Sequence, residues 1–370
     1  MAASEVYFWD LRASRKAPYE VKVKRLLKLA ALGAKLQSGD LTAVKLHFGE
    51  AGGTAHIQPL QLVPLLTFIR KCGARPFLTD TNTLYVGQRG ESASHGLQAA
   101  RHGFDPNVLG APVIIADGLK SGNERAVPFA GKHFDTFYLA GDIVDADMLV
   151  TVSHFKGHEL AGFGGAIKNA GMGCATRKGK MQQHCGLGPE IHPDHCAGCG
   201  QCVAVCAHNA LSLDENGRIR IERDNCAGCA ACFLVCKTKG LEVDWRVDVN
   251  TFLERMAEYA AAALLSRPRP SLHLSFVQRV GPGCDCMGYS DAPICPDLGL
   301  LASWDPVALD QACLDMVNAA QPLYPSALPA GLAPGQDKFE AIHGHVRGRY
   351  LLGYAEGLGL GRREYTLRAV

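Results

Sequence analysis

Residues 148–153 read MLVTVS, a short apolar run that ends in a polar residue. This pattern is typical of a strand that is buried on both faces of a sheet. The same pattern occurs in TAVKLHF (42–48), RPFLTD (75–80) and PVIIAD (112–117), and a further strand is predicted over SLHLSFV (271–277).

Helical patterns separate these strands. Apolar residues recur at helical spacing in YEVKVKRLLKLAALGAKL (19–36) and in PLQLVPLLTFIRKCG (59–73). Helices are also predicted over VNTFLERMAEYAAAALLSR (249–267) and from Asp305, a suitable N-cap that precedes Pro306. Because strands and helices alternate, the sequence predicts the α/β class with a mostly parallel sheet.

The middle of the chain carries two cysteine runs of the pattern C-x2-C-x2-C-x3-C, in DHCAGCGQCVAVCAHNA (194–210) and NCAGCAACFLVCKTK (225–239). Over residues 190–242 this spacing resembles a bacterial-type ferredoxin domain with two [4Fe–4S] clusters. Ala207 and Lys237 stand where such ferredoxins usually have proline. The alternative, zinc, uses pairs of cysteines further apart and fits two complete runs poorly.

The ferredoxin resemblance implies a crosswise ligand assignment, because in that family the fourth cysteine of each run binds the other cluster. One cluster would take Cys196, Cys199, Cys202 and Cys236, and the other Cys226, Cys229, Cys232 and Cys206. The predicted organisation is a discontinuous α/β domain (1–189 and 243–370) with an inserted α+β ferredoxin-like module (190–242).

Composition excludes several classes of protein. The 370 residues are 47% hydrophobic with a formal charge of +2, which indicates a globular protein without a bulk argument for nucleic-acid binding. No signal-peptide pattern or membrane-length apolar run is seen. Fifteen cysteines in ligand-like spacing then favour metal sites in a reducing cytoplasm over disulfides. A homodimer is expected from base rates alone.

Polar residues follow four of the predicted strands. They are His47, Glu50, Asp80, Asn82, Asp117 and His154. Ligands of open α/β sheets collect at the carboxyl ends of strands, so we expect a binding site there. The alternatives are that Asp80 and Asp117 cap turns and that His47 is a core histidine.

The segment SHFKGHELAGFGGAIKNAGMGCATRKGK (153–180) combines glycines with basic side chains. Glycines allow backbone N–H groups to approach an anion closely, so the segment predicts a site for an anionic substrate or cofactor. Its candidate residues are His154, Lys156, His158, Lys168 and Asn169. His154 and His158 are four apart and would share a helix face. A glycine-rich turn with solvated lysines is the alternative, and neither a Walker loop nor a dinucleotide fingerprint is present.

A family resemblance spans most of the chain. It is carried by KLHFGE (45–50), DTNTLY (80–85), SHFKGHELAGFGGAIKNAGMG (153–173), CDC (284–286) and DPVALDQA (305–312). Together these motifs resemble the iron–sulfur proteins of domain-of-unknown-function family 362, which implies a ferredoxin module within an α/β domain and no general activity. His158 followed by GFGGAIKNAGMG is also similar to the histidine–glycine–lysine segment of nickel-pincer lactate racemases.

Cys284 and Cys286 form a C-x-C pair that suits a soft metal or a third cluster, the alternative being ordinary buried thiols. The favoured function is a redox enzyme that moves electrons through two [4Fe–4S] clusters to a small-molecule substrate, with a protein as redox partner. In it His47 and His154 move protons, Lys156 and Lys168 bind or stabilise negative charge, and the substrate contacts Glu50, Asp80, Asn82, His158 and Asn169. The alternatives are a non-catalytic electron carrier, a metal- or cluster-handling protein, and a metal-dependent isomerase with structural clusters.

Overall fold

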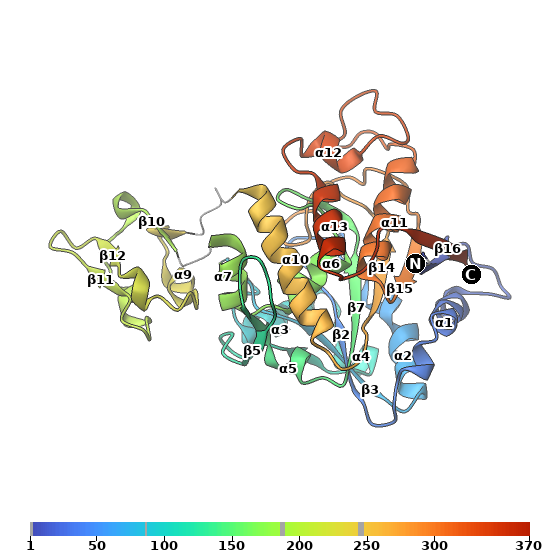
Figure 1. Ribbon diagram of the computed structural model, residues 1–370, viewed down its shortest axis with the longest axis horizontal. Helices are drawn as coiled ribbons and strands as arrows, with labels where there is room; N and C mark the ends of the chain where they lie inside the picture. Colours follow the sequence, from blue (N-terminus) through green and yellow to red (C-terminus); the bar gives the residue numbers. More distant parts are fainter. Residues whose placement is uncertain (1–2, 86, 186–188, 243–247) are drawn as a thin grey trace.

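The computed structural model of the protein describes residues 3–85, 87–185, 189–242 and 248–370. Its centre is an 8-stranded sheet in the order β16-β1-β15-β14-β7-β2-β3-β4 (Figure 1). The strands are β1 (Ser4–Trp9), β2 (Leu41–Lys45), β3 (Arg75–Asp80), β4 (Val113–Ile115), β7 (Met148–His154), β14 (Leu272–Val277), β15 (Gly299–Ser303) and β16 (Tyr365–Ala369). β15 is antiparallel to both of its neighbours and the other pairings are parallel, so the predicted α/β class with a mostly parallel sheet is confirmed.

Helices cover both faces of the sheet. On one face lie α1 (Tyr19–Leu29), α2 (Val63–Lys71) and α3 (Ser92–Arg101), and on the other α6 (Ala166–Cys174), α10 (Val249–Leu265), α11 (Pro306–Ala319) and α13 (Gly348–Gly357). Neighbouring side chains of β7 point to opposite faces, as a strand requires: Leu149 packs with α6 and α10, and Val150 with α1 and α2. Both faces of the strand are thus buried, which explains why apolar residues occupy both alternating sets of positions in its first half.

Two predicted elements end earlier than the sequence pattern suggests. β2 stops at Lys45, and the chain turns at Gly49 with φ +82°, so His47 lies in a loop. α1 stops at Leu29 because Ala31 adopts a left-handed conformation, and a short 3-10 helix (Leu32–Ala34) follows. The predicted start of α11 is confirmed, since the Asp305 side chain accepts the first free N–H groups of that helix.

The glycine-rich segment does not continue as one helix after β7. Lys156–His158 (β8) and Gly162–Gly164 (β9) form a two-stranded hairpin, and α6 begins only after it. The expectation that His154 and His158 share a helix face is therefore wrong. Gly157 explains the hairpin, because a Cβ at this position would lie 1.9 Å from the Pro282 carbonyl oxygen.

The cysteine-rich segment, residues 189–242, lies at one end of the molecule beside α7 (Arg177–Cys185) (Figure 1). It contains the same order of elements twice, strand, 3-10 helix, α-helix and strand. The elements are β10 (Glu190–Ile191), η3 (Pro193–His195), α8 (Gln201–Ala204) and β11 (Leu211–Leu213), then β12 (Ile219–Ile221), η4 (Arg223–Asn225), α9 (Ala231–Val235) and β13 (Leu241–Glu242). β10 pairs with β13 and β11 with β12.

The cysteine-rich segment interrupts a single sheet. β7 precedes it and β14 follows it, and these two strands are parallel neighbours. The remaining elements are η2 (Pro59–Leu62), α4 (Pro106–Leu109), β5 (Glu124–Pro128), β6 (Thr136–Ala140), α5 (Gly141–Val144) and α12 (Lys338–Ile342). Among the helices of the described residues, none is long and apolar enough to cross a membrane.

Candidate functional site

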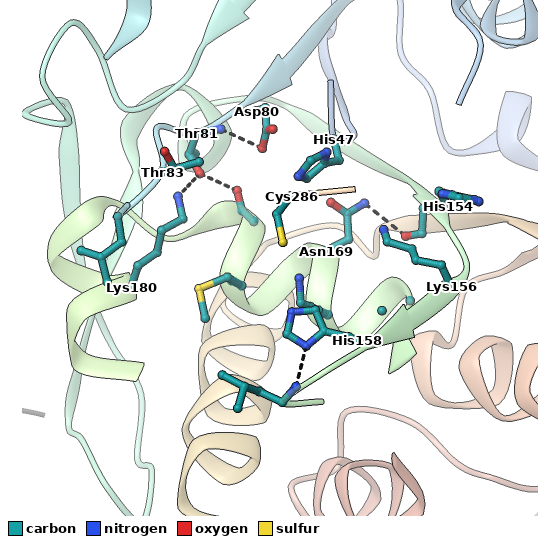
Figure 2. A pocket seen from close by; sticks show the side chains of 18 of the residues that line it. His47, Asp80, Thr81, Thr83, His154, Lys156, His158, Asn169, Lys180 and Cys286 are labelled. Atoms are coloured by element: carbon teal, nitrogen blue, oxygen red, sulfur yellow. Dashed lines mark hydrogen bonds between the residues drawn. The ribbon is translucent and has the colours of Figure 1, made fainter. Parts of the chain in front are cut away.

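A cavity of about 580 Å³ lies at the carboxyl edge of the parallel strands. β2, β3 and β7 all end at this edge, and the cavity is completed by the β8–β9 hairpin, α6, α7 and the loop that follows β14. Figure 2 shows that His47, Asp80, Lys156, His158, Lys180 and Cys286 surround it. Most of the residues that the sequence assigns to a site are therefore brought together in one place.

One wall of the cavity is an ion-pair network centred on Asp80. The Lys45 ammonium lies 3.0 Å from one carboxylate oxygen and the Arg89 guanidinium 3.4 Å from the other. Burial alone would raise the pKa of Asp80, but the charge of Lys45 and the neighbouring His95 hold it well below its usual value. Asp80 is thus an ionised, fully paired carboxylate, and its role is to orient the cations.

A second network holds the opposite wall. Asp285 lies 2.9 Å from Nδ1 of His154 and 3.2 Å from the Lys156 ammonium. Nε2 of His154 faces the Gln278 carbonyl oxygen at 2.8 Å. Both ring nitrogens of His154 therefore meet acceptors, which leaves neither free to take a proton from a substrate.

His47 has a different environment. Its Nδ1 accepts the N–H of Gly49 at 3.0 Å, and the ring points into the cavity (Figure 2). Burial and the charge of Arg89 lower its pKa well below the usual value. His47 is thus a neutral imidazole whose ring proton sits on Nε2 toward the cavity, so in this tautomer it can donate a hydrogen bond or a proton to a bound group.

The third group is a thiol pair beside a histidine. The ligand atoms of His158, Cys284 and Cys286 all lie within 4.8 Å of one another. The Lys168 ammonium lies 3.8 Å from Cys284 Sγ. A hydrogen bond from Cys286 and the charge of Lys168 hold the pKa of Cys284 well below its usual value.

Three predicted substrate contacts have internal partners. The Asn169 amide bonds to Lys45, Val152 and Ser153 and so ties α6 to the ends of β2 and β7. Asn82 bonds to Asp117 and Gly118 and is fully buried without lining the cavity. Glu50 pairs with Arg89 behind the cavity wall.

The glycine-rich segment brings backbone amides to a carboxyl group of the chain itself, Asp310, whose pKa burial raises to about 7. The N–H groups of Ala166 and Ile167, at the start of α6, bond to the Asp310 carboxylate at 2.7 and 2.9 Å. A Cβ at Gly165 would lie 2.3 Å from the same carboxylate, so glycine is required for this contact. These amides are therefore not available to a ligand, and the cavity offers lysine side chains instead.

The cysteine-rich segment contains two hollows, each lined by four cysteines. One is lined by Cys196, Cys199, Cys202 and Cys236, and the other by Cys206, Cys226, Cys229 and Cys232. Each hollow thus takes three cysteines from one run and the fourth from the other run. The backbone repeats as well, since Gly198 and Gly228, and likewise Gly200 and Ala230, have positive φ at equivalent positions.

Helix α7 connects one hollow to the cavity. Met181 lines the hollow of Cys226, whereas Lys180 and His184 on the same helix line the cavity. Met181 lies about 100° around the helix from Lys180, so the two spaces contact neighbouring faces of the same helix. The other hollow, which contains the exposed Cys199, has no such contact in its lining.

Sequence reasoning missed Lys45, Arg89 and Asp285. Lys45 carried a usable signal, because a charged residue inside a buried strand must find a partner. Asp285 lies between two cysteines, whose spacing points to a metal site and gives no reason to single out the aspartate. Arg89 lies in a loop that matches no sequence motif. Their roles depend on partners far away in the sequence.

The fold and the site define an α/β protein with a charged, thiol-containing cavity at the carboxyl edge of its sheet. Residues 42–315 match the model of the family described as "Domain of unknown function (DUF362)". The match covers most of the chain, so the protein belongs to this family. No protein with a curated description matches the sequence.

Among solved structures, the chain is similar to the lactate racemase apoprotein from Thermoanaerobacterium thermosaccharolyticum, with 13% identity, a TM-score of 0.38 and 74% of this chain covered. It is also similar to a structural-genomics protein from Thermotoga maritima, with 10% identity, a TM-score of 0.44 and 82% covered. The chain spans 51% and 59% of the lengths of these two structures.

Proposed function

We propose that the protein is an iron–sulfur oxidoreductase, in which residues 190–242 hold two [4Fe–4S] clusters and the cavity binds an anionic substrate. The observation that carries this proposal is the pair of hollows. Each collects the interlocked set of cysteines that two-cluster ferredoxins use. Such clusters supply one-electron transfer when bound.

The lining of the cavity supports an anionic substrate. Lys168 lies beside Cys284, and the Lys180 ammonium bonds to the Thr81 hydroxyl and to carbonyl oxygens. Neither lysine has a carboxylate partner among the ion pairs of the described residues. In this proposal both lysines hold the substrate's negative charge, and the Nε2–H of His47 donates a hydrogen bond or a proton to the substrate.

The position of α7 supports a direction for the relay. The hollow of Cys206, Cys226, Cys229 and Cys232 is the one next to the cavity, with Met181 between them. Cys199, in the other hollow, is exposed and offers a place at which a redox partner protein could dock. Electrons then pass between the partner protein and the cavity through the clusters in both hollows.

The test is anaerobic reconstitution followed by iron and sulfide analysis and electron paramagnetic resonance. We expect about eight irons for each chain. Cys236→Ser should change the signal of the cluster that the first cysteine run supplies and leave the other intact, whereas Cys72→Ser, at the C-terminal end of α2 and outside both runs, should change neither. Two unaltered signals in Cys236→Ser would contradict the interlocked assignment.

Catalysis is tested separately on the reduced protein. Small-molecule fractions of cell extract are screened for those that reoxidise it, and the active fraction is tested on His47→Gln and Lys168→Met. His47→Gln should lose at least about 100-fold of the turnover, because general acid–base catalysis contributes about that much. Lys168→Met should lose about as much, because a positioned charge on the developing anion contributes a similar factor. Unchanged turnover would remove the cavity from the proposal and leave an electron carrier.

A second candidate function is a metal-dependent isomerase. The compact group of His158, Cys284 and Cys286 at the cavity favours it. This function predicts turnover without any electron donor or acceptor. An assay on fully oxidised protein distinguishes it from the oxidoreductase.

A further inference from the structure

We propose that Cys284, Cys286 and His158 bind a single soft or borderline transition-metal ion, such as Zn²⁺ or Ni²⁺, separate from the eight cysteines of the cysteine-rich segment. Their ligand atoms all lie within 4.8 Å of one another. In a tetrahedral site with bonds of about 2.0–2.3 Å, such atoms lie about 3.5 Å apart. The three donors therefore need to close by only about 1 Å around an ion.

The C-x-C turn is held in place from both sides. Its middle residue, Asp285, is fixed by His154 and Lys156. The backbone N–H of Cys286 donates to Cys284 Sγ at 3.4 Å, which keeps the two sulfurs on the same side of the turn. The position of the two cysteines is thus set by contacts of the turn between them.

The β8–β9 hairpin brings His158 to this turn. The N–H of Gly157 donates to the Gly281 carbonyl at 2.9 Å, and glycine is the residue that leaves room for the Pro282 carbonyl. The hairpin and the C-x-C loop therefore touch backbone to backbone. The neighbouring His158 side chain reaches the sulfurs as a result.

The histidine ring is also oriented. Nδ1 of His158 accepts the N–H groups of Leu160 and Ala161 at 3.2 and 3.1 Å, which leaves Nε2 as the donor to Cys284. A metal ion on Nε2 replaces that proton and requires the ring proton to sit on Nδ1. Metal uptake should therefore break the two amide hydrogen bonds, which gives a readout that is independent of activity.

The site has room for an exchangeable ligand. His158 and Cys286 line the cavity, and the chain supplies three ligands, as in catalytic zinc sites that keep one position for water or substrate. Two thiolates and a neutral imidazole neutralise a divalent ion, and the nearby Lys168 favours an added anion. The fourth ligand should therefore be a carboxylate or hydroxyl oxygen of the cavity's anion.

The experiment uses the full chain with its iron content measured beforehand. Zinc and cobalt are titrated in competition with a chelator, and cobalt binding is followed by its ligand-field bands. We expect one metal ion for each chain beyond the iron. Binding should be lost in the Cys284→Ser/Cys286→Ser double variant, weakened by about 10-fold or more in His158→Ala, and unchanged in Cys295→Ala, a buried thiol of the same loop that does not line the cavity.

Hydrogen exchange supplies the second measurement. The peptide containing Leu160 and Ala161 should exchange faster when zinc is bound, and its exchange should not change with zinc in the double variant. The proposal is overturned if wild-type protein takes up no extra ion, if the double variant binds as well as wild type, or if the extra metal is a third iron–sulfur cluster. Because iron and the added metal are counted separately, failure here leaves the two-cluster proposal standing, and the reverse also holds.

Discussion

The charge of the cavity is set by individual buried cations and hardly by the net charge of +2. Lys45 and Lys156 each have a carboxylate partner, Asp80 and Asp285 respectively. Lys180 instead bonds to neutral oxygens, and burial lowers its pKa to about 8, so it keeps most of its charge at neutral pH. A binding anion would give Lys180 its missing counter-charge, and this is a local preference that composition cannot reveal.

His273 allows a test of burial at the scale of one residue. It is buried in β14 beside the Thr151 hydroxyl, and burial lowers its pKa to about 3. In the unfolded chain, His273 binds a proton below pH about 6.5, whereas in the folded chain it stays neutral until the pH approaches 3. Protonation therefore favours the unfolded chain, and the free energy of unfolding falls as the pH drops from about 6.5 toward 3. At pH 5 the loss should be about 2 kcal/mol of the free energy of unfolding.

The measurement is urea unfolding of wild type and His273→Gln between pH 7 and pH 5. The variant should lose less stability over this range than wild type, by about 2 kcal/mol, whatever its stability at pH 7. His345→Gln, at an exposed histidine, serves as the control and should follow wild type. Parallel curves for wild type and His273→Gln would contradict the assignment of a neutral, buried ring.

The first N–H groups of helix α6 find their hydrogen-bond acceptor on another helix. Asp310 of α11 accepts the Ala166 and Ile167 amides, which have no partner within α6. Asp310→Ala should lower the free energy of unfolding by about 2–3 kcal/mol, because it leaves two buried donors unpaired. Asp310→Asn keeps one acceptor oxygen and should cost about half as much, and equal losses in the two variants would contradict this role.

The same elements show what sequence patterns can and cannot predict. Buried strands such as β7 (MLVTVSH) and β14 (LHLSFV) were predictable because short segments rich in apolar and β-branched residues are typical of strands. β8 and β9 were not, because three residues carry no periodicity and their pairing depends on the contact between Gly157 and Pro282.

The site follows the same rule. His47 and Lys168 were found because they follow a predicted strand or lie in an unusual motif. Asp285 and Arg89 were missed because only tertiary contacts give them partners. Sequence therefore predicts where a site lies along the sheet edge, and the geometry of ion pairs decides which residues face it.

The cysteine-rich segment is joined to the sheet domain by apolar contacts. Leu84 and Met181 belong to the same buried cluster as Leu211 and Phe233 of the segment. Leu234 also packs against Gly90, where a Cβ would lie 3.3 Å from its side chain. These apolar contacts place the segment against the sheet domain, as transfer between its thiols and the cavity would require.

Met181 is the residue at which this arrangement can be tested. Met181→Ala should lower the free energy of unfolding by about 2–3 kcal/mol, because it empties a buried position in the interface. It should also alter the magnetic signal of the cluster in the adjacent hollow and leave the other signal unchanged. Val235→Ala, in the lining of the other hollow, is the matched control and should show the opposite pattern. Equal changes of both signals in Met181→Ala would mean that the two hollows are not distinguished by their distance from the cavity, and the direction proposed for the relay would then be wrong.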